Sequence, residues 1–359
     1  MKNSIKVLFI GNHRQDRSPG QRFRFEQYFD YLNANEVSCE FSNLLNESDD
    51  KYFYSKGKWA IKFFILIKCF LKRLKDVKRA NDFDVIFIFR EAFFTGTTFF
   101  ERKFKQSTAK VIFDFDDSIW LPNVSPGNKK LEWLKNYNKT KDIINLADFV
   151  IAGNQYLADY ASKYNKNIHV IPTTIDTSYH KIQKQLNNRI CIGWTGTTTT
   201  IKHFEIAIPV LLRLKEKYKD QIYFKVIGEE KYIHKDLGIE GVQWNISTEI
   251  KELSELDIGI MPLPNDQWTQ GKCGFKGLQY MALEIPTIMS PVGVNTEIIE
   301  NGVNGFLAKA EEEWLTTISM LIESSELRSI IGAAGRKTII KNYSVEANKQ
   351  KYLDLLNEV

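Results

Sequence analysis

The sequence offers little material for a disulfide framework or a metal centre. Its four cysteines are far apart and none forms a CxxC pair, which favours reduced thiols in a cytosolic protein. Its five histidines form no HExxH motif and no cluster with cysteine, so we expect no metal and no other cofactor. The cysteines are Cys39, Cys69, Cys191 and Cys273.

Long hydrophobic runs and a dinucleotide fingerprint are absent too. No stretch reaches the roughly 18 apolar residues that a membrane span needs, and the first apolar run, Ile5 to Ile10, reads as a strand rather than a signal peptide. No first turn reads GxGxxG, which argues against a dinucleotide dehydrogenase. The net charge of +5 is modest; it suits an anionic substrate or a membrane surface, and we expect no nucleic-acid partner.

The pattern that is present alternates strands with helices twice over 359 residues. Ile5 to Ile10 opens the first series, and Arg189 to Trp194 opens the second. Two such α/β series predict two Rossmann-like domains that face each other across a cleft. We predict a first domain at residues 1–175, a polar linker, a second domain at 189–343, and a helix at 344–359 that packs back on the first domain.

The segment from Trp59 to Ala80 has apolar residues at helical spacing between basic flanks. Two readings remain open for residues 56–79: an interfacial helix with its lysines on anionic head groups, or a helix packed on the sheet with lysine stems over apolar surface. The basic residues are Lys56, Lys58, Lys72, Arg73, Lys75, Lys78 and Arg79.

Charged residues follow several predicted strands of the first domain. Arg90 ends one strand, and Asp116 and Asp117 follow another; the carboxyl ends of parallel strands form the crevice where open α/β sheets bind ligands. Arg22, in the first strand–helix connection, is a further candidate. An aspartate here could position or deprotonate an acceptor hydroxyl, if its pKa were raised.

Gly271 to Ile299 reads as loop, helix, strand, loop and helix. Glycine-rich turns and helix starts present free N–H groups to phosphate, and Lys272 and Lys276 add positive charge. Lys202, at the start of another predicted helix, is a third candidate for a diphosphate clamp, because a cation is disfavoured there without a ligand.

The order of four segments resembles the retaining nucleotide-sugar glycosyltransferases of family four, which have the GT-B fold, over nearly the whole chain. The segments are SPGQRFRFEQY, FDFDDSIW, IGWTGTTTTIKHF and GKCGFKGLQYMALEIPTIMSPVGVNTEIIENGVNGFL. One feature departs from the family: the paired glutamates are missing, with Gly271 and Gln279 in their places. The chain resembles a subgroup with GKxxFKxxQYM, in which the amide of Gln279 could bond ribose hydroxyls.

The resemblance implies roles for individual residues. Lys276, Asp117 and Arg22 are the candidates for catalysis, and Arg90 and Asp116 lie on the acceptor side. Asp114-Phe115-Asp116 matches a DxD metal motif literally but falls on the acceptor side, as an acceptor contact or as architecture. The donor-binding candidates are Gly193, Gly196, Thr197, Lys202, Gly228, Trp244, Lys272, Phe275, Gln279, Val292, Gly293 and Glu297.

By this resemblance the chain moves a sugar, with retention and without a protein nucleophile, from a nucleoside diphosphate sugar to a glycan or lipid-linked acceptor. Its setting would be surface polysaccharide or glycolipid assembly, in the cytoplasm or on the inner face of the membrane. Two alternatives remain: a nucleotide-sugar epimerase of the same fold, and a non-catalytic nucleotide-sugar-binding partner. The sugar, the base, the acceptor and the oligomeric state are not encoded in a readable way.

Overall fold

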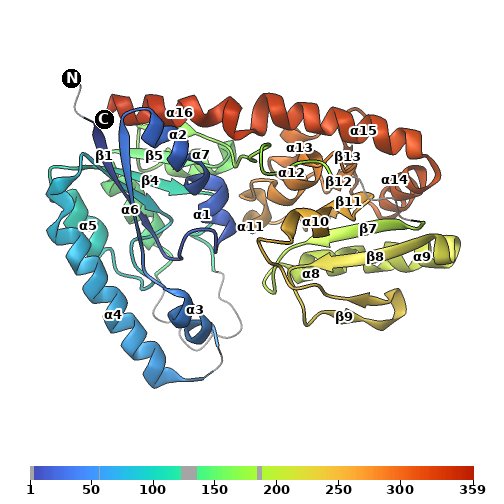
Figure 1. Cartoon of the computed structure of the whole chain (residues 1–359), viewed down its shortest axis with the longest axis horizontal. Helices are drawn as coiled ribbons and strands as arrows, with labels where there is room; N and C mark the ends of the chain where they lie inside the picture. Colours follow the sequence, from blue (N-terminus) through green and yellow to red (C-terminus); the bar gives the residue numbers. More distant parts are fainter. Residues whose placement is uncertain (1–3, 56, 123–135, 184–187) are drawn as a thin grey trace. The chain divides into compact units, whose positions relative to one another are not determined.

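The computed structural model describes residues 4–55, 57–122, 136–183 and 188–359. The chain divides into two compact units, the first formed by Met1–Thr173 with Lys349–Val359 and the second by Thr174–Asn348. Each unit contains one parallel sheet with helices around it (Figure 1). The predicted fold class, two parallel-sheet α/β domains of GT-B type, is confirmed.

Unit 1 has a six-stranded sheet in the order β2-β1-β3-β4-β5-β6, with all neighbours parallel. The four inner strands are largely buried apolar runs, as expected when helices cover both faces, whereas the edge strands β2 and β6 are mostly half-buried or exposed. The strands are β1 (Ile5–Gly11), β2 (Val37–Asn43), β3 (Val85–Phe89), β4 (Lys110–Phe115), β5 (Phe149–Ala152) and β6 (Ile168–Val170). The helices are α1 (Pro19–Arg24), α2 (Phe29–Ala34), α3 (Glu47–Phe53), α4 (Trp59–Lys78), α5 (Phe99–Lys105), α6 (Lys139–Leu146) and α7 (Gln155–Ala161).

The last helix, α16 (Val345–Glu358), begins in unit 2 and ends in unit 1. Tyr352 is 2% exposed; its ring lies 4.4 Å from that of Tyr28, and its hydroxyl donates to the Arg24 carbonyl at 2.6 Å. The predicted return of the C-terminal helix to the first domain therefore has a specific anchor in the core of unit 1.

Unit 2 has a five-stranded parallel sheet in the order β13-β12-β11-β7-β8 and a small antiparallel pair, β9 and β10. The strands are β7 (Ile190–Thr195), β8 (Ile222–Ile227), β9 (Ile233–His234), β10 (Ile239–Glu240), β11 (Ile258–Met261), β12 (Thr287–Met289) and β13 (Phe306–Leu307). The helices are α8 (Ile201–Phe204), α9 (Ile208–Tyr218), α10 (Glu249–Ser254), α11 (Gln267–Gln270), α12 (Phe275–Ala282), α13 (Asn295–Ile298), α14 (Glu311–Glu323) and α15 (Ser325–Thr338).

Helix α4 includes most of residues 56–79, for which the sequence left open an interfacial helix or a helix packed on the sheet. One face packs on unit 1 through Ile65, Cys69 and Arg73. Arg73 is fully buried, and its guanidinium donates to the carbonyls of Ala92 and Gly11 and to Asp76. The expectation that Arg73 belongs to an exposed basic flank is therefore wrong, because its guanidinium is hydrogen-bonded to buried partners within unit 1.

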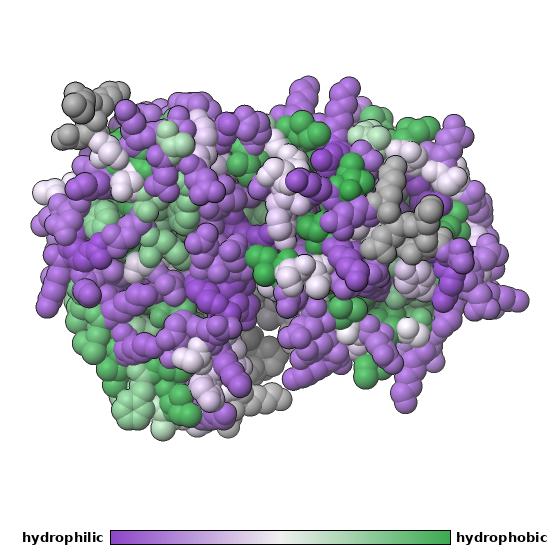
Figure 2. Space-filling model, in the orientation of Figure 1, coloured by the Kyte–Doolittle hydropathy of each residue, from purple (hydrophilic) through white to green (hydrophobic). Residues whose placement is uncertain are grey.

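The opposite face of α4 is exposed and apolar. Figure 2 shows hydrophobic residues gathered over this helix, at the lower left of the view. The large apolar side chains, each between 38% and 69% exposed, are Trp59, Ile61, Phe63, Phe64, Ile67, Phe70 and Leu71. We call this set the α4 face. The helix thus packs on its unit and also leaves a hydrophobic surface uncovered.

Candidate functional site

In unit 2, the turns that follow β7 and β8 touch each other at the carboxyl edge of the sheet. Gly228 has φ +103°, and a Cβ there would lie 1.9 Å from the Gly196 carbonyl oxygen. A Cβ on Gly196 would meet the Trp194 ring at 2.1 Å. Both glycines are therefore required by backbone packing at the edge where parallel sheets bind ligands.

The turn after β12 packs on the loop that leads into α12. Gly293 has φ +54°, and a Cβ there would lie 2.5 Å from the Gln270 carbonyl oxygen. Gly274, with φ +69°, precedes α12, and its Cβ would meet Ile298 of α13 at 2.3 Å. These close approaches bring Lys272, the start of α12 and the start of α13 to one place.

The charges of three predicted lysines act on a buried histidine that the sequence analysis did not select. His203 is 4% exposed and its Nδ1 has no hydrogen-bond partner among the described residues. Its pKa is lowered to about 4, first by burial and then by the charges of Lys276, Lys272 and Lys202. The three lysines therefore act on one point, although they come from α8, α12 and the loop before α12.

Aromatic rings support two of these lysines. The Lys276 Nζ lies 5.4 Å from the centroid of Trp194, and the Lys272 Nζ lies 5.3 Å from that of Trp268. Cation–π contacts of this kind orient an ammonium group without neutralising its charge. The edge of the sheet therefore keeps a concentration of positive charge beside glycine turns.

A second missed residue, Glu249, joins two predicted ones. Its Oε1 accepts from the Gln279 amide at 3.2 Å and from the Trp244 indole N–H at 3.0 Å, and its Oε2 accepts from the Tyr179 hydroxyl at 3.2 Å. Glu249 and Gln279 are 4% and 2% exposed. A carboxylate from α10 thus lies beside Gln279, the position at which the resemblance led us to expect a glutamate.

The other donor-side candidates have mainly local contacts. A Cβ on Gly193 would meet Leu256 at 2.1 Å, so this glycine makes room for the core. Thr197 opens the turn before α8, where its N–H donates to the Thr200 hydroxyl at 2.9 Å. Phe275 is half-buried at the start of α12, Val292 is buried, and Glu297 is exposed on α13.

In unit 1, Arg90 follows β3 in the left-handed region, at φ +61°. Side chains other than glycine rarely adopt this conformation, and when they do the residue is often functional. Its Nε donates to Asp116 Oδ1 at 2.7 Å, and its Nη2 lies 3.8 Å from Asp117 Oδ2. Three predicted acceptor-side residues are therefore in contact. Arg22 is 8% exposed, with Nε 3.7 Å from Asp16.

Asp114, the first acid of the DxD sequence, is architectural. It is fully buried and accepts from Arg24 Nε at 3.1 Å and from Arg24 Nη2 at 2.5 Å. Arg24 is equally buried and also donates to the Ile171 carbonyl. Of the two readings given to this sequence, architecture holds for Asp114, whereas Asp116 contacts Arg90.

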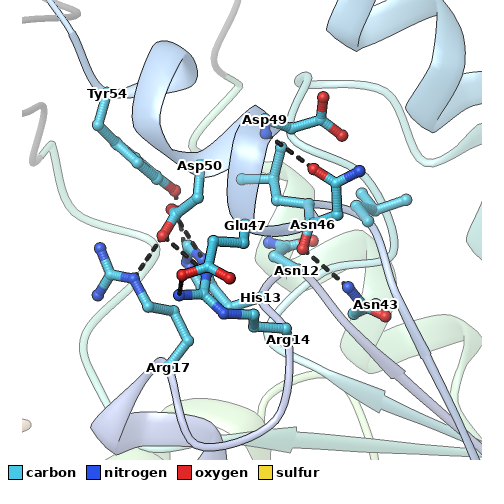
Figure 3. A network of polar contacts seen from close by, with 12 residues as sticks. Asn12, His13, Arg14, Arg17, Asn43, Asn46, Glu47, Asp49, Asp50 and Tyr54 are labelled. Carbon is cyan, nitrogen blue, oxygen red and sulfur yellow. Dashed lines mark hydrogen bonds and ion pairs between the residues drawn. The ribbon is translucent and has the colours of Figure 1, made fainter.

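A polar network that the sequence analysis did not predict lies after β1 (Figure 3). Arg14 Nη1 and Arg17 Nε donate to Asp50 Oδ2 at 3.1 and 2.5 Å. His13 Nδ1 lies 3.9 Å from Asp50 Oδ1, and its Nε2 lies 3.3 Å from the Tyr54 hydroxyl. Because α3 was not predicted, nothing in the sequence indicated that Asp50 would meet this loop.

Residues 189–324 match the family model described as "Glycosyl transferases group 1". This segment, a little over a third of the chain, is similar to that glycosyltransferase domain. The prediction that the chain is an enzyme, a glycosyltransferase, is confirmed. No curated protein sequence matches the chain. Lys202, Lys272, Lys276, His203, Glu249 and Gln279 all lie within the matched segment.

Solved structures with the same fold span the whole chain. The HepE protein of Anabaena, solved with UDP-glucose, is 14% identical with a TM-score of 0.66, covering 99% of this chain and 100% of that one. A glycosyltransferase from Rickettsia africae is 16% identical with a TM-score of 0.68, covering 100% and 99%. Sucrose-phosphate synthase from Thermosynechococcus elongatus is 12% identical with a TM-score of 0.71, covering 99% and 98%.

None of the helices in the described part of the chain is both long enough and apolar enough to cross a membrane. The assignment of individual site residues, the absence of a metal and the domain boundaries drawn from the sequence stay predictions.

Proposed function

We propose that the chain transfers a sugar, with retention of its anomeric configuration, from a nucleoside diphosphate sugar to a glycan or lipid-linked acceptor. The observation that carries this proposal is the positive charge of Lys202, Lys272 and Lys276, which all acts on the buried His203 in a segment that matches a glycosyltransferase family model. Trp268 and Trp194 hold two of these lysines beside glycine turns. A surface polysaccharide or glycolipid is the proposed product class.

The lysines fit the main chemical demand of this reaction. The diphosphate gains negative charge as the glycosidic bond to it breaks, and fixed cations and N–H groups lower the energy of that state. Lys276 and Lys272 are held over aromatic rings beside glycine turns, so their ammonium groups can meet a diphosphate without a metal. Lys202 is exposed at the start of α8 and adds a third charge.

We assign the nucleoside to the neighbouring pair Trp244 and Gln279. Both donate to Glu249, which turns the Gln279 amide so that its oxygen remains as an acceptor for a ribose hydroxyl. The HepE structures with UDP and with UDP-glucose support a nucleoside diphosphate sugar as donor, and we propose UDP-glucose as the first donor to test.

On the acceptor side, Arg90 places Asp116 and Asp117 as hydrogen-bond acceptors for a sugar hydroxyl. The proposed retention follows a front-face substitution, in which the departing diphosphate takes the acceptor's proton and no protein nucleophile is needed. Arg22 stays a proposed catalytic residue of this side.

We further propose that the α4 face binds the surface of a bilayer that contains anionic lipid. An exposed apolar patch of this kind marks an interaction site on a protein surface, and Lys72, Lys75 and Lys78 follow it on the same helix. A helix with an apolar face and a basic end suits the head-group region of such a bilayer. The proposed location is therefore the inner face of the membrane.

Product analysis with a labelled donor tests the proposed function. Purified protein, UDP-glucose labelled in the sugar and a lipid or glycan acceptor extract should give labelled acceptor and UDP in equal amounts, with the anomeric configuration kept. Conversion of the sugar without an acceptor would establish the epimerase instead. If nucleotides bind tightly, as judged by a raised melting temperature, while no nucleotide sugar turns over, the chain is a non-catalytic binding partner.

A further inference from the structure

The loop after β1 is held in one conformation by Gln21. Its Oε1 accepts from the N–H groups of Asn12 and His13 at 3.1 and 2.9 Å, and its Nε2 donates to the His13 carbonyl and to Glu26 at 2.9 Å. Glu26 in turn accepts from the Asp16 N–H at 2.8 Å. Loop residues fixed by buried partners present their side chains in a set geometry.

Two of those side chains, Arg14 and Arg17, share one carboxylate. Asp50 is 8% exposed, and both guanidinium groups are directed toward it (Figure 3). Arg17 uses only its Nε for this contact; in the described part of the chain its two terminal nitrogens have no partner, and its side chain is 42% exposed. Arg14 Nη2 also lies 3.7 Å from Glu47 Oε1, so Asp50 and Glu47 together balance the two arginine charges. The donors that this group leaves for a ligand include the two terminal nitrogens of Arg17.

Buried polar atoms around Asp50 are unsatisfied as well. Asp50 Oδ1, His13 Nδ1 and Asn12 Oδ1 are all buried, and none of them has a hydrogen-bond partner among the described residues. Unsatisfied buried polar atoms are few in folded proteins. Of these three atoms only His13 Nδ1, when it carries a proton, can donate to a phosphate oxygen, because the oxygens of Asp50 and Asn12 are acceptors. Arg17, Arg90 and Arg14 all act on His13 and help to lower its pKa, which burial mainly brings to about 4. The Asp50 carboxylate acts in the opposite direction and raises the pKa of His13.

We propose that Arg14 and Arg17, held by Asp50, bind the phosphate or diphosphate group of a lipid-linked acceptor. Guanidinium groups match the geometry of phosphate oxygens and keep their charge at any relevant pH. This inference rests on the proposed function, because it assigns the head group of the acceptor that the enzyme glycosylates.

The lipid-linked source is favoured over a soluble anion by what adjoins the site. Helix α3 carries Asp50, and the neighbouring Asp49 accepts from Lys68 of α4 at 2.6 Å. The Lys58 ammonium, just before α4, lies 4.5 Å from the ring centroid of Tyr52 on α3. Helix α3 thus connects the arginine pair to α4, whose opposite face is exposed and apolar. A phosphorylated lipid has an anionic group that suits the arginines and an apolar chain that suits the α4 face.

Isothermal titration of the full chain with farnesyl diphosphate tests the proposal. We would use the Lys276→Ala background in every arm, so that the proposed donor site does not contribute. Adding Arg17→Gln should weaken binding at least about 10-fold, as expected for the loss of a charged hydrogen bond, and adding Arg17→Lys should restore part of it. Arg213→Gln, which changes an arginine of unit 2 paired with Glu311 and Glu312, should leave the affinity unchanged.

Titrations with inorganic pyrophosphate and with glucuronate distinguish a lipid-linked phosphate from a free phosphate and from an acidic glycan. If pyrophosphate binds more weakly than farnesyl diphosphate, the result supports a lipid-linked ligand. If the two bind equally, the proposed lipid-linked ligand is overturned in favour of a free phosphate. Glucuronate binding that depends on Arg17, without such dependence for farnesyl diphosphate, overturns it in favour of an acidic glycan. The same affinity in Arg17→Gln and its parent removes the site altogether. No donor sugar is present, so these results are independent of whether transfer occurs.

Discussion

The carboxylate of Glu249 accepts a hydrogen bond from the amide of Gln279, with 3.2 Å between Oε1 and Nε2. The two residues are 30 positions apart and both are buried. This pair brings a carboxylate next to the position at which the resemblance led us to expect a glutamate, and the carboxylate contacts the Gln279 amide. Gln279 is therefore oriented by a charged partner rather than being charged itself.

Replacing Glu249 by Gln should reduce the affinity for UDP by about 10-fold, because the charged acceptor that orients both Gln279 and Trp244 is lost. Calorimetric titration with UDP measures this change, and urea denaturation shows whether the fold is kept. Glu252→Gln is the matched control: it lies on the same helix and pairs with Lys225 at 2.6 Å. Unchanged affinity in Glu249→Gln would show that the pair has no part in nucleotide binding.

Lys276→Ala should lower the turnover of the transfer reaction by about 100-fold or more, the usual effect of removing one group that stabilises developing charge. The melting temperature should change little, because Lys276 is only half-buried. Lys337→Ala changes an exposed lysine of α15 in the same unit and should keep full turnover. Equal activity of the two variants would contradict the diphosphate role of Lys276.

Flotation with liposomes checks the α4 face. Wild-type protein should float with vesicles that contain anionic lipid, and the double change Phe63→Asp with Phe64→Asp should abolish this, since these rings are 60% and 69% exposed. Replacing Lys72 and Lys75 by Glu should weaken flotation selectively on anionic vesicles. Arg73 is left unchanged, because replacing this buried, hydrogen-bonded residue would destabilise unit 1. Recovery that is insensitive to both changes would exclude this surface as the contact.

Glu26 should make the stability of unit 1 depend on pH. Burial raises its pKa from 4.5 to about 7, despite hydrogen bonds from the Asp16 N–H and from Gln21. A raised pKa means that the folded state holds the proton more tightly than the unfolded state. The stabilisation is complete below about pH 4.5 and is lost as the pH rises through about 7, a difference on the order of 3 kcal/mol.

Urea denaturation of wild type and Glu26→Gln at about pH 5 and about pH 7.5 measures this difference. The free energy of unfolding of the wild type should fall between the two pH values by more than that of the variant. Glu358→Gln, at the exposed end of α16 in the same unit, should behave like the wild type. Parallel pH profiles for wild type and Glu26→Gln would rule out Glu26 as the cause.

The inner strands of both parallel sheets were predictable because most of them are short, continuous apolar runs, as β3 is, and two series of them indicated two α/β domains. Helices were predicted less well where their sequences are mixed. Phe25, Phe29 and Leu32 share one helical face and predict a single helix from Arg22 to Leu32, but the structure has three short pieces there, with a 3-10 turn at Glu26–Tyr28 between α1 and α2. The pattern of Leu131 to Leu146 also predicts one helix; α6 begins at Lys139, and the first residues of that stretch lie outside the described part of the chain.

Candidate site residues could be selected from the sequence where they share one continuous stretch, as Lys272, Lys276 and Gln279 do. His203 and Glu249 were missed because their significance comes from contacts between distant segments. The sequence held a weak signal for each. His203 directly follows Lys202. Glu249 is an acid in the first turn of α10, where the helix dipole alone accounts for it, so its three side-chain partners could not be inferred. For Asp50 the missing prediction of α3 removed any signal.

Helix α16 has a consequence for how the polypeptide reaches its native state. Unit 1 holds the first 173 residues but also residues 349–359, and Tyr352, Leu355 and Leu356 are buried in it. Domains usually fold in order as they leave the ribosome. Here the earlier unit must wait, with the pocket for Tyr352 open, until synthesis has passed through the whole of the later one.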